Sequence, residues 1–189
     1  MTFTKTLTAA AAIMSITAGA AFADGHAMNP TVGGAEMSTE MNIVENAMNS
    51  PIHTTLVAAV VAADLAETLS GEGPFTVFAP TDDAFAALPE GAVEDLLKPE
   101  NKDRLTQILT CHVVAADAMS DAIQGMIADD NGKHPVPTVG GCTLQATYTD
   151  GMIMLEDEQG RIATVTVADV KQSNGVIHVI DTVLLPSAS

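Results

Sequence analysis

The chain has 189 residues, of which 24 are acidic and 7 are basic, and its formal net charge at pH 7 is −17. A surface this acidic repels DNA, RNA and anionic lipid, which excludes nucleic-acid binding. Repulsion between copies of so acidic a chain favours a monomer. The lack of tryptophan and the single tyrosine, Tyr148, also exclude a platform of several exposed aromatic rings for sugars or bases.

The first 23 residues have the pattern of an export signal. Lys5 gives a positive start, residues 7–20 are apolar, and Ala21-Phe22-Ala23 is a small-x-small cleavage site. A buried N-terminal helix is the alternative, and the apolar run is too short to span a membrane. Cleavage removes Lys5 and no acidic residue, which takes the net charge to −18. We expect an exported protein, periplasmic or secreted, without a membrane anchor.

Residues 24–41 are small, polar and rich in methionine, a composition that predicts a flexible leader. We place one domain at residues 42–186 and a short tail at 187–189. Asn42 stands three residues before Glu45, the spacing of a capping side chain and its partner at a helix start.

A long amphipathic helix is predicted over residues 54–69, capped by Thr54 or Thr55 and ended by Gly71. Apolar residues recur every four positions along it and predict one buried stripe. The stripe consists of Val57, Val61, Leu65 and Leu69.

Residues 75–79 are of β type, and Pro80 breaks this strand. Thr81 then caps a short helix whose first turn holds two aspartates, which the helix dipole favours. The next elements are two helices, a strand and a helix, at residues 92–97, 102–111, 112–114 and 118–127.

From residue 136 onward the pattern is that of β-strands. Asp150-Gly151 tolerates positive φ angles and predicts a hairpin between strands at 142–148 and 152–156. Two further strands, at 162–170 and 176–185, are joined through Asn174-Gly175. Helices first and strands later predict an α+β domain.

Three segments mark a known family. Phe-Thr-Val-Phe-Ala-Pro-Thr runs from Phe75 to Thr81, His112 opens a strand after a helix, and Asn-Gly-Val-Ile-His-Val-Ile-Asp starts at Asn174. In this order they resemble the fasciclin domain, an extracellular adhesion and interaction module, over residues 42–186. The resemblance implies a wedge of two β-sheets with several helices in the N-terminal half. The motif residues expected to have structural roles are Phe78, Pro80, Thr81, Asn174, Gly175, His178 and Asp181.

The resemblance also implies positions for partner binding. The family usually shows Tyr-His where this chain has Cys111-His112, so only the histidine carries over. In animal relatives, integrin binding has been attributed to an Asp-Ile pair ahead of the closing strand, and Asp169-Val170 stand there. We therefore expect Asp169, Val170 and His112 to contact a partner, an unknown protein or cell-surface glycan. A solvated strand-end charge is the alternative for Asp169.

Cys111 and Cys142 are the only cysteines. An even count in an exported chain predicts a disulfide, and two buried free thiols are the alternative. The bond would close a loop of about 31 residues and stabilise the fold by ~3–4 kcal/mol.

His112 and His178 lie in apolar, strand-like runs. We expect both rings to be buried and hydrogen-bonded to backbone or to a carboxylate, with Asp181 as a candidate partner. Metal ligation by both is the alternative, and it lacks a clear third ligand nearby in sequence.

Within the predicted domain, no group of residues predicts an enzyme, a metal site or a cofactor. No serine lies in a nucleophile elbow. Cys111 and His112 are adjacent where the predicted helix passes into the predicted strand, and as neighbours in extended chain their side chains point to opposite faces. Residues 129–132 are similar to the start of a calcium loop without its distal glutamate.

A second function stays open at the mature N-terminus. Cleavage after Ala23 exposes Asp24-Gly25-His26, whose amine, two amides and imidazole suit square-planar Cu(II) or Ni(II). Thioethers for Cu(I) are offered by Met28, Met37, Met41 and Met48. An exported fasciclin-like (periostin-like) binding module is therefore the leading interpretation, and periplasmic copper handling is the alternative.

Overall fold

The structure is a computed structural model, and it describes residues 30–187. The helices are α1 (Ile43–Asn49), α2 (Thr54–Ala62), α3 (Ala66–Ser70), α4 (Asp82–Ala86), α5 (Ala92–Leu96), η1 (Pro99–Asn101), α6 (Lys102–Cys111) and α7 (Ser120–Asp129). The strands are β1 (Thr31–Val32), β2 (Ala35–Glu36), β3 (Phe75–Pro80), β4 (Val113–Val114), β5 (Lys133–Pro137), β6 (Thr143–Thr149), β7 (Met152–Glu156), β8 (Ile162–Gln172) and β9 (Gly175–Ile180). The predicted α+β class is confirmed.

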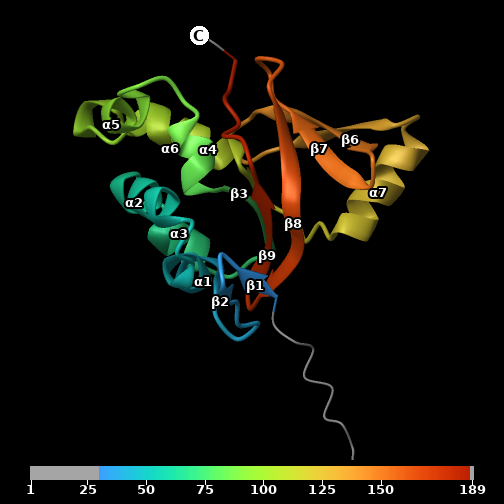
Figure 1. Cartoon of the computed structure of the whole chain (residues 1–189), viewed down its shortest axis with the longest axis horizontal. Coiled ribbons are helices and arrows are strands. Elements are labelled where there is room, and N and C mark those ends of the chain that lie inside the picture. The colour runs from blue at the N-terminus through green and yellow to red at the C-terminus, as the bar shows by residue number, and fades with distance from the viewer. Residues whose placement is uncertain (1–29, 188–189) are drawn as a thin grey trace, which may run out of the picture.

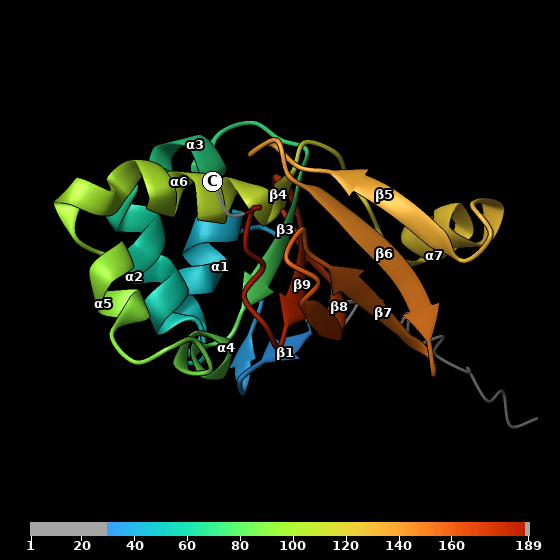
Figure 2. The same ribbon diagram turned by 90° about the horizontal axis from the view of Figure 1, so that it is seen from above.

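The main sheet has seven strands in the order β4-β3-β9-β8-β7-β6-β5. Residues 162–164 of β8 pair with β7, and from Val165 onward β8 pairs with β9 instead. The register of β8 against β9 shifts twice between Val165 and Val170, as β-bulges do where a strand bends. The two halves of the predicted wedge are therefore continuous through β8. Helices α1–α6 lie on one side of the wedge, and α7 lies on the other (Figures 1 and 2).

Strands β3 and β9 are neighbours in this sheet and pair in parallel, with Phe78 opposite His178. Alternate residues of this pair face two separate cores: Val77 and Ile177 pack with the helices, whereas Phe78 and Ile180 pack with α7 and β5–β8. A strand that is covered on both faces needs apolar residues at nearly every position. This explains why the family segments on β3 and β9 are both apolar runs.

Two of the predicted helix caps are confirmed. Asn42 accepts the N–H of Glu45 over 2.9 Å, and the Glu45 carboxylate accepts the N–H of Asn42 over 2.9 Å, which completes a capping box. The Thr81 hydroxyl accepts the N–H of Ala84 over 3.2 Å at the start of α4.

The cap of α2 comes from another helix, so the prediction of Thr54 or Thr55 is wrong. His53 occupies the N-cap position without a side-chain bond. The carboxylate of Asp82, on α4, accepts the N–H and hydroxyl of Thr54 and, over 2.8 Å, the N–H of Thr55. A tertiary contact thus satisfies donors that a local side chain usually satisfies.

The predicted helix 54–69 is broken into α2 and α3. Asp64 adopts a left-handed φ of 57°, and the N–H of Leu65 bonds to the carbonyl of Val60 over 3.0 Å, as in a helix-ending Schellman turn. The buried face of α2 is also offset from the predicted stripe, which is wrong at Val61, because this side chain is 57% exposed. The residues of α2 that are buried are Leu56, Ala59 and Val60.

The predicted leader extends too far into the domain. Within the described residues, β1 and β2 form a hairpin, and Val32 and Met37 are both 2% exposed in the helical core. Two apolar side chains in this short stretch bury enough surface to hold it. Residues 30–41 therefore belong to the folded domain, and residues 24–29 lie outside the described part of the chain.

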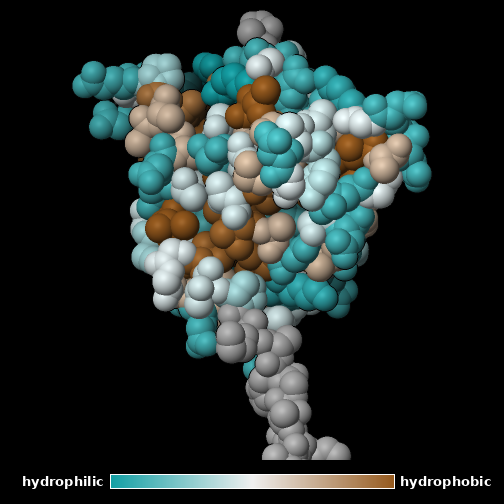
Figure 3. Space-filling view, turned by 45° about the vertical axis from the view of Figure 1, so that its right-hand side comes forward, coloured by the Kyte–Doolittle hydropathy of each residue, from teal (hydrophilic) through white to brown (hydrophobic). Residues whose placement is uncertain are grey.

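Exposed apolar side chains are spread over many elements: Met41, Met48, Val61, Met126, Val139, Tyr148, Met152 and Ile162. On the face shown in Figure 3, apolar groups are separated by hydrophilic ones. No helix between residues 30 and 187 combines the length and the apolar character needed to cross a bilayer.

Candidate binding cleft

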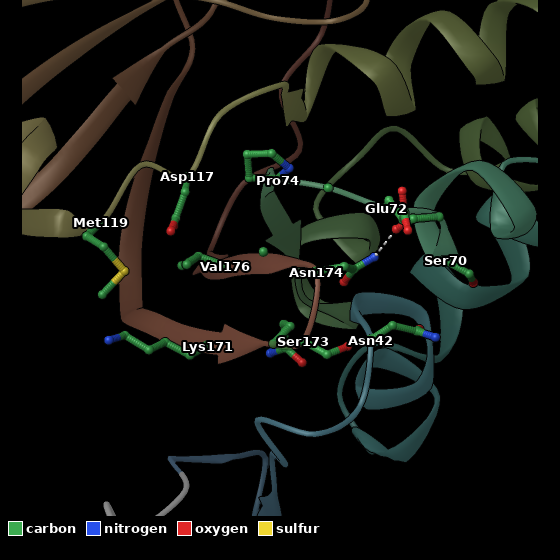
Figure 4. Close-up of a pocket in the computed structure, with 14 residues that line it drawn as sticks. Asn42, Ser70, Glu72, Pro74, Asp117, Met119, Lys171, Ser173, Asn174 and Val176 are labelled. Carbon is green, nitrogen blue, oxygen red and sulfur yellow. Dashed lines mark hydrogen bonds between the residues drawn. The ribbon is translucent and has the colours of Figure 1, made fainter.

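A hollow on the described surface opens beside the Asn174-Gly175 turn, and we call it the binding cleft. It has a volume of about 640 Å³ and is formed by the α3–β3 connection, the segment before α7, and the end of β8 with the start of β9. Figure 4 shows Asp117, Pro74 and Glu72 along one side, with Lys171, Ser173 and Asn42 along the other. Segments far apart in sequence thus meet around one diagnostic turn.

Asn174 fixes the floor of the binding cleft. Its amide donates to the carbonyls of Leu69 and Gly71 over 2.8 and 2.9 Å, and its carbonyl oxygen accepts the N–H of Ile43 over 3.0 Å. One side chain therefore joins the ends of α1 and α3 to the turn before β9. This gives a physical reason for asparagine at the start of the closing motif.

Gly175 allows β9 to begin directly against β3. A Cβ at this position would lie 1.9 Å from the carbonyl oxygen of Phe75, far inside van der Waals contact. The backbone of Gly73 approaches equally closely, because a Cβ there would lie 1.9 Å from the carbonyl oxygen of Asn174. The floor of the binding cleft is consequently backbone packed on backbone.

The segment before α7 forms the wall that carries Asp117 and Met119. The Thr76 hydroxyl donates to the carbonyl of Ala116 over 2.6 Å and accepts the N–H of Ala118 over 2.8 Å. Nε2–H of His178 donates to the carbonyl of Ala118 over 2.8 Å. This wall is therefore held by side chains from both β3 and β9.

Charges of both signs face the binding cleft. Glu72, Asp117 and Lys171 line it, and all three are exposed. Within residues 30–187, Lys171 takes part in none of the ion pairs, which involve Lys98, Lys102, Lys133, His134 and Arg161. Its ammonium group is thus available to an incoming carboxylate. Sequence reasoning missed these three residues, although a lysine in so acidic a chain was a usable signal.

Asp169 lies next to the binding cleft in a structural role. It is half-buried in the β8 bulge with a left-handed φ of 59°. Its carboxylate accepts the N–H of Ser120 over 2.7 Å and also the Ser120 hydroxyl, so it caps the first turn of α7. Both carboxylate oxygens already have donors, and partner contact by Asp169 stays a prediction.

Val170 and His112 cannot contact a partner in this fold, so those two predictions are wrong. Val170 is 0% exposed and His112 is 2% exposed. Val170 follows the bulge and points into the helical core. His112 is the C-cap of α6 rather than a strand residue, and its ring is enclosed.

His178 is buried as predicted, but its expected partner Asp181 is wrong. Asp181 is exposed, and its carboxylate accepts the N–H of Thr164 over 2.8 Å. Residues three apart on a strand point to opposite faces, which separates the two side chains. Burial lowers the pKa of the His178 ring, although its bond to Ala118 and two nearby carboxylates oppose this shift.

The predicted disulfide between Cys111 and Cys142 is confirmed, with a Cα–Cα distance of 5.4 Å. It joins the end of α6 to the start of β6, where the connection at Gly140 packs against Thr110. The position that holds a tyrosine in the family is thus used here for a covalent link between the helical side and the sheet.

One Ser–His contact exists in the described structure, and it is enclosed. The Ser50 hydroxyl and Nδ1 of His53 lie 2.7 Å apart, and each residue is 3% exposed. A substrate cannot reach this pair, so it has the properties of a core contact rather than of a nucleophile and its base. Within residues 30–187 no three His, Cys, Asp or Glu side chains gather as a metal site. The proposed Asp24–His26 copper site lies outside the described residues and stays a prediction.

Comparison with known proteins identifies relatives along most of the chain. A family model of the fasciclin domain matches residues 51–186. Protein sll1483 of Synechocystis sp. is 48% identical over 191 residues, which cover 94% of this chain and 97% of the relative.

Two more distant similarities concern proteins whose names carry a location or role. Cell surface glycolipoprotein MPB83 of Mycobacterium bovis is 33% identical, covering 86% of this chain and 69% of the relative. The solved FAS1 domain pair of the insect cell adhesion molecule Fasciclin I matches with a TM-score of 0.68 at 18% identity, covering 77% of this chain and 51% of the other. At that identity the match shows the fold alone.

Proposed function

The chain belongs to the fasciclin domain family, and on that premise we propose that it is an exported, non-catalytic module that binds another protein through the binding cleft. The similarity to a cell surface glycolipoprotein supports the location. The export-signal pattern of residues 1–23 supports export. The binding cleft supports the mode of action, because the motif histidines are enclosed while this hollow is open to a partner.

The observation that carries the proposal is the placement of three charged side chains on a rigid frame. Asn174, Gly175 and the parallel β3–β9 pair fix the floor, and the backbone positions of Glu72, Asp117 and Lys171 are therefore set around it. A frame that is ordered in advance loses less entropy on binding. A partner segment with a basic side chain toward the carboxylates and an acidic one toward Lys171 fits this arrangement.

A protein segment fits the binding cleft better than a glycan does. Sugar rings are commonly held by stacking on aromatic side chains. None of the residues lining the binding cleft is aromatic, and Tyr148 lies at the tip of the β6–β7 hairpin outside it. Charged groups without a ring favour recognition by ion pairs and hydrogen bonds.

The test is capture from envelope or extracellular material with the mature chain as bait. The double variant Glu72→Lys/Asp117→Lys reverses two charges of the binding cleft, and Lys171→Glu reverses the third. We expect each to weaken capture by about tenfold or more, the size of a lost interfacial ion pair. Glu90→Lys/Asp129→Lys is the matched control, because it changes the net charge equally at exposed sites elsewhere.

Three outcomes are informative. Loss of capture in the binding-cleft variants alone supports the proposal. Equal loss in the control means that only the overall charge matters, and full capture by every variant places the partner elsewhere. Enzymatic deglycosylation of the material before capture separates a protein partner from a glycan, because only a glycan partner is lost.

A further inference from the structure

His178 connects two backbone segments through the two nitrogens of its ring. Nε2–H donates to the carbonyl of Ala118 over 2.8 Å, and Nδ1 accepts the N–H of Asp169 over 3.3 Å. The ring is 0% exposed and stacks on Phe78, with centroids 5.7 Å apart. Only the neutral ring with its proton on Nε2 satisfies both contacts, because a protonated ring has two donors and no acceptor.

Asp169 links this ring to the first turn of α7. Its backbone N–H points to His178, while its carboxylate accepts both the N–H and the hydroxyl of Ser120. Ala118 and Ser120 are two fixed points on the wall of the binding cleft, with Met119 between them and Asp117 directly before Ala118. The state of one buried ring is therefore mechanically connected to that wall.

We propose that His178, Asp169 and Ser120 form an acid-sensitive latch on the wall of the binding cleft. When Nδ1 takes a proton from solvent, it becomes a donor facing the N–H of Asp169, and that contact is lost. The Asp169 carboxylate then exchanges Ser120 for the imidazolium, which uncaps α7 and loosens the wall at Met119 and Ser120, while Thr76 still holds Ala116 and Ala118. Protonation of a buried histidine is a common trigger of such two-state changes.

The groups that surround the ring set the direction of the response. Phe78 on β3 is apolar, and the carboxylates that act on the ring are those of Asp169 on β8 and Asp117 before α7. Burial lowers the pKa of His178, and these carboxylates together with the Ala118 carbonyl oppose that shift. The latch therefore stays closed at neutral pH and opens as the pH falls below the usual histidine range.

The latch rests on the proposed function only in its consequence, which is that acid weakens binding in the cleft. Its test is an NMR titration of the mature chain without any partner, followed through the His178 ring nitrogens and the backbone amides. We expect the Nε2–H form at neutral pH, and we expect the amides of Asp169, Met119 and Ser120 to titrate together with the ring. The proposal is overturned if the neutral ring carries its proton on Nδ1, or if the backbone amide signals do not change as the ring titrates.

Two variants sharpen this test. Ser120→Ala removes the hydroxyl donor to Asp169, which frees the carboxylate for the ring, so the pKa of His178 should rise; Ser173→Ala, on the opposite wall, is the control that should leave it unchanged. An unchanged His178 pKa in Ser120→Ala contradicts the coupling. His178→Gln keeps an N–H for Ala118 without titrating and should abolish the wall's pH response. Should it fail to fold, Ser120→Ala still decides.

The two proposals fail separately. A chain whose ring and wall titrate together but which captures no partner retains the latch and loses the proposed function. A chain that captures a partner through Glu72, Asp117 and Lys171 with equal strength across the ring's titration retains the function and loses the latch.

Discussion

The backbone N–H of Leu184 donates to Nε2 of His112 over 2.9 Å, a contact between residues 72 positions apart. Nδ1–H of the same ring donates to the carbonyl of Ile108 over 2.8 Å. His112 thus joins the end of α6 to the segment that follows β9, and it does so only as a neutral ring. The family's second motif histidine acts here as an internal connector.

This contact predicts a loss of stability in mild acid. Burial lowers the pKa of His112 from 6.5 to about 4, and the bond to Ile108 only partly opposes it. Between pH 6.5 and about 4, the unfolded chain therefore binds a proton at His112, whereas the ring stays unprotonated in the folded chain. The stabilising contribution is complete above pH 6.5 and is lost as the pH falls to about 4. At ~1.4 kcal/mol per tenfold change in proton affinity, the free energy of unfolding should fall by about 3 kcal/mol, measurable by urea denaturation.

The variant His112→Gln isolates this effect. It should be less stable than the natural chain near neutral pH, because its amide fits the two contacts less well, but its stability should decline less steeply toward acid. His134→Gln is the control, since that ring lies on β5 outside the two cores. An equally steep decline in His112→Gln would mean that other groups cause it.

Removing the disulfide should lower stability without changing the fold. The double variant Cys111→Ser/Cys142→Ser opens a loop of 31 residues, for which the chain-entropy model gives a loss of about 3–4 kcal/mol. Thermal or urea unfolding of both proteins measures it. Titration of the unfolded, unreduced natural chain should find no free thiol, and two thiols would contradict the bond.

Two glycines should respond oppositely to alanine. Gly175→Ala places a Cβ 1.9 Å from the carbonyl oxygen of Phe75, so β9 must move away from β3 and stability should fall by several kcal/mol, roughly the range of severe backbone clashes. Gly125→Ala on α7 meets no atom within 4 Å and should stabilise by about 0.5–1 kcal/mol through helix propensity. Similar effects at both sites would contradict the close strand approach.

Asn174→Ala should destabilise the floor of the binding cleft. It leaves the carbonyls of Leu69 and Gly71 and the N–H of Ile43 without their partner, at a cost of about 2–3 kcal/mol. Asn49→Ala is the matched control, because its exposed amide contacts only the Met41 sulfur among the described residues. Chemical denaturation compares them, and equal losses would show that Asn174 has no special role.

Local signals in the sequence were sufficient for most of the fold. The Thr81 cap and the Asn42–Glu45 capping box both depend on side chains within one helical turn. The Asp150-Gly151 hairpin likewise needs only neighbours. These local structures can be predicted from the sequence because the interacting residues lie only a few positions apart.

Contacts between residues far apart in the sequence could not be predicted in the same way. Asp82 lies 28 and 27 positions after Thr54 and Thr55, the residues that it caps on α2, and no neighbour of Thr54 in the sequence predicts this contact. Val170 reads as part of an acidic–aliphatic pair, yet the bulge in β8 turns it into the core and leaves Asp169 to cap α7. Residues 30–41 read as polar leader, yet two apolar side chains anchor them.

The sequence by itself determined the family, the α+β class and the pairing of the only two cysteines, because these depend on ordered motifs and on composition. Only the tertiary structure decided which residues are available to a partner. The parallel pairing of β3 with β9 encloses His178, and it brings Glu72, Asp117 and Lys171 from three separate segments to one open cleft. Accessibility is a property of packing between distant segments, and no local pattern in the chain encodes it.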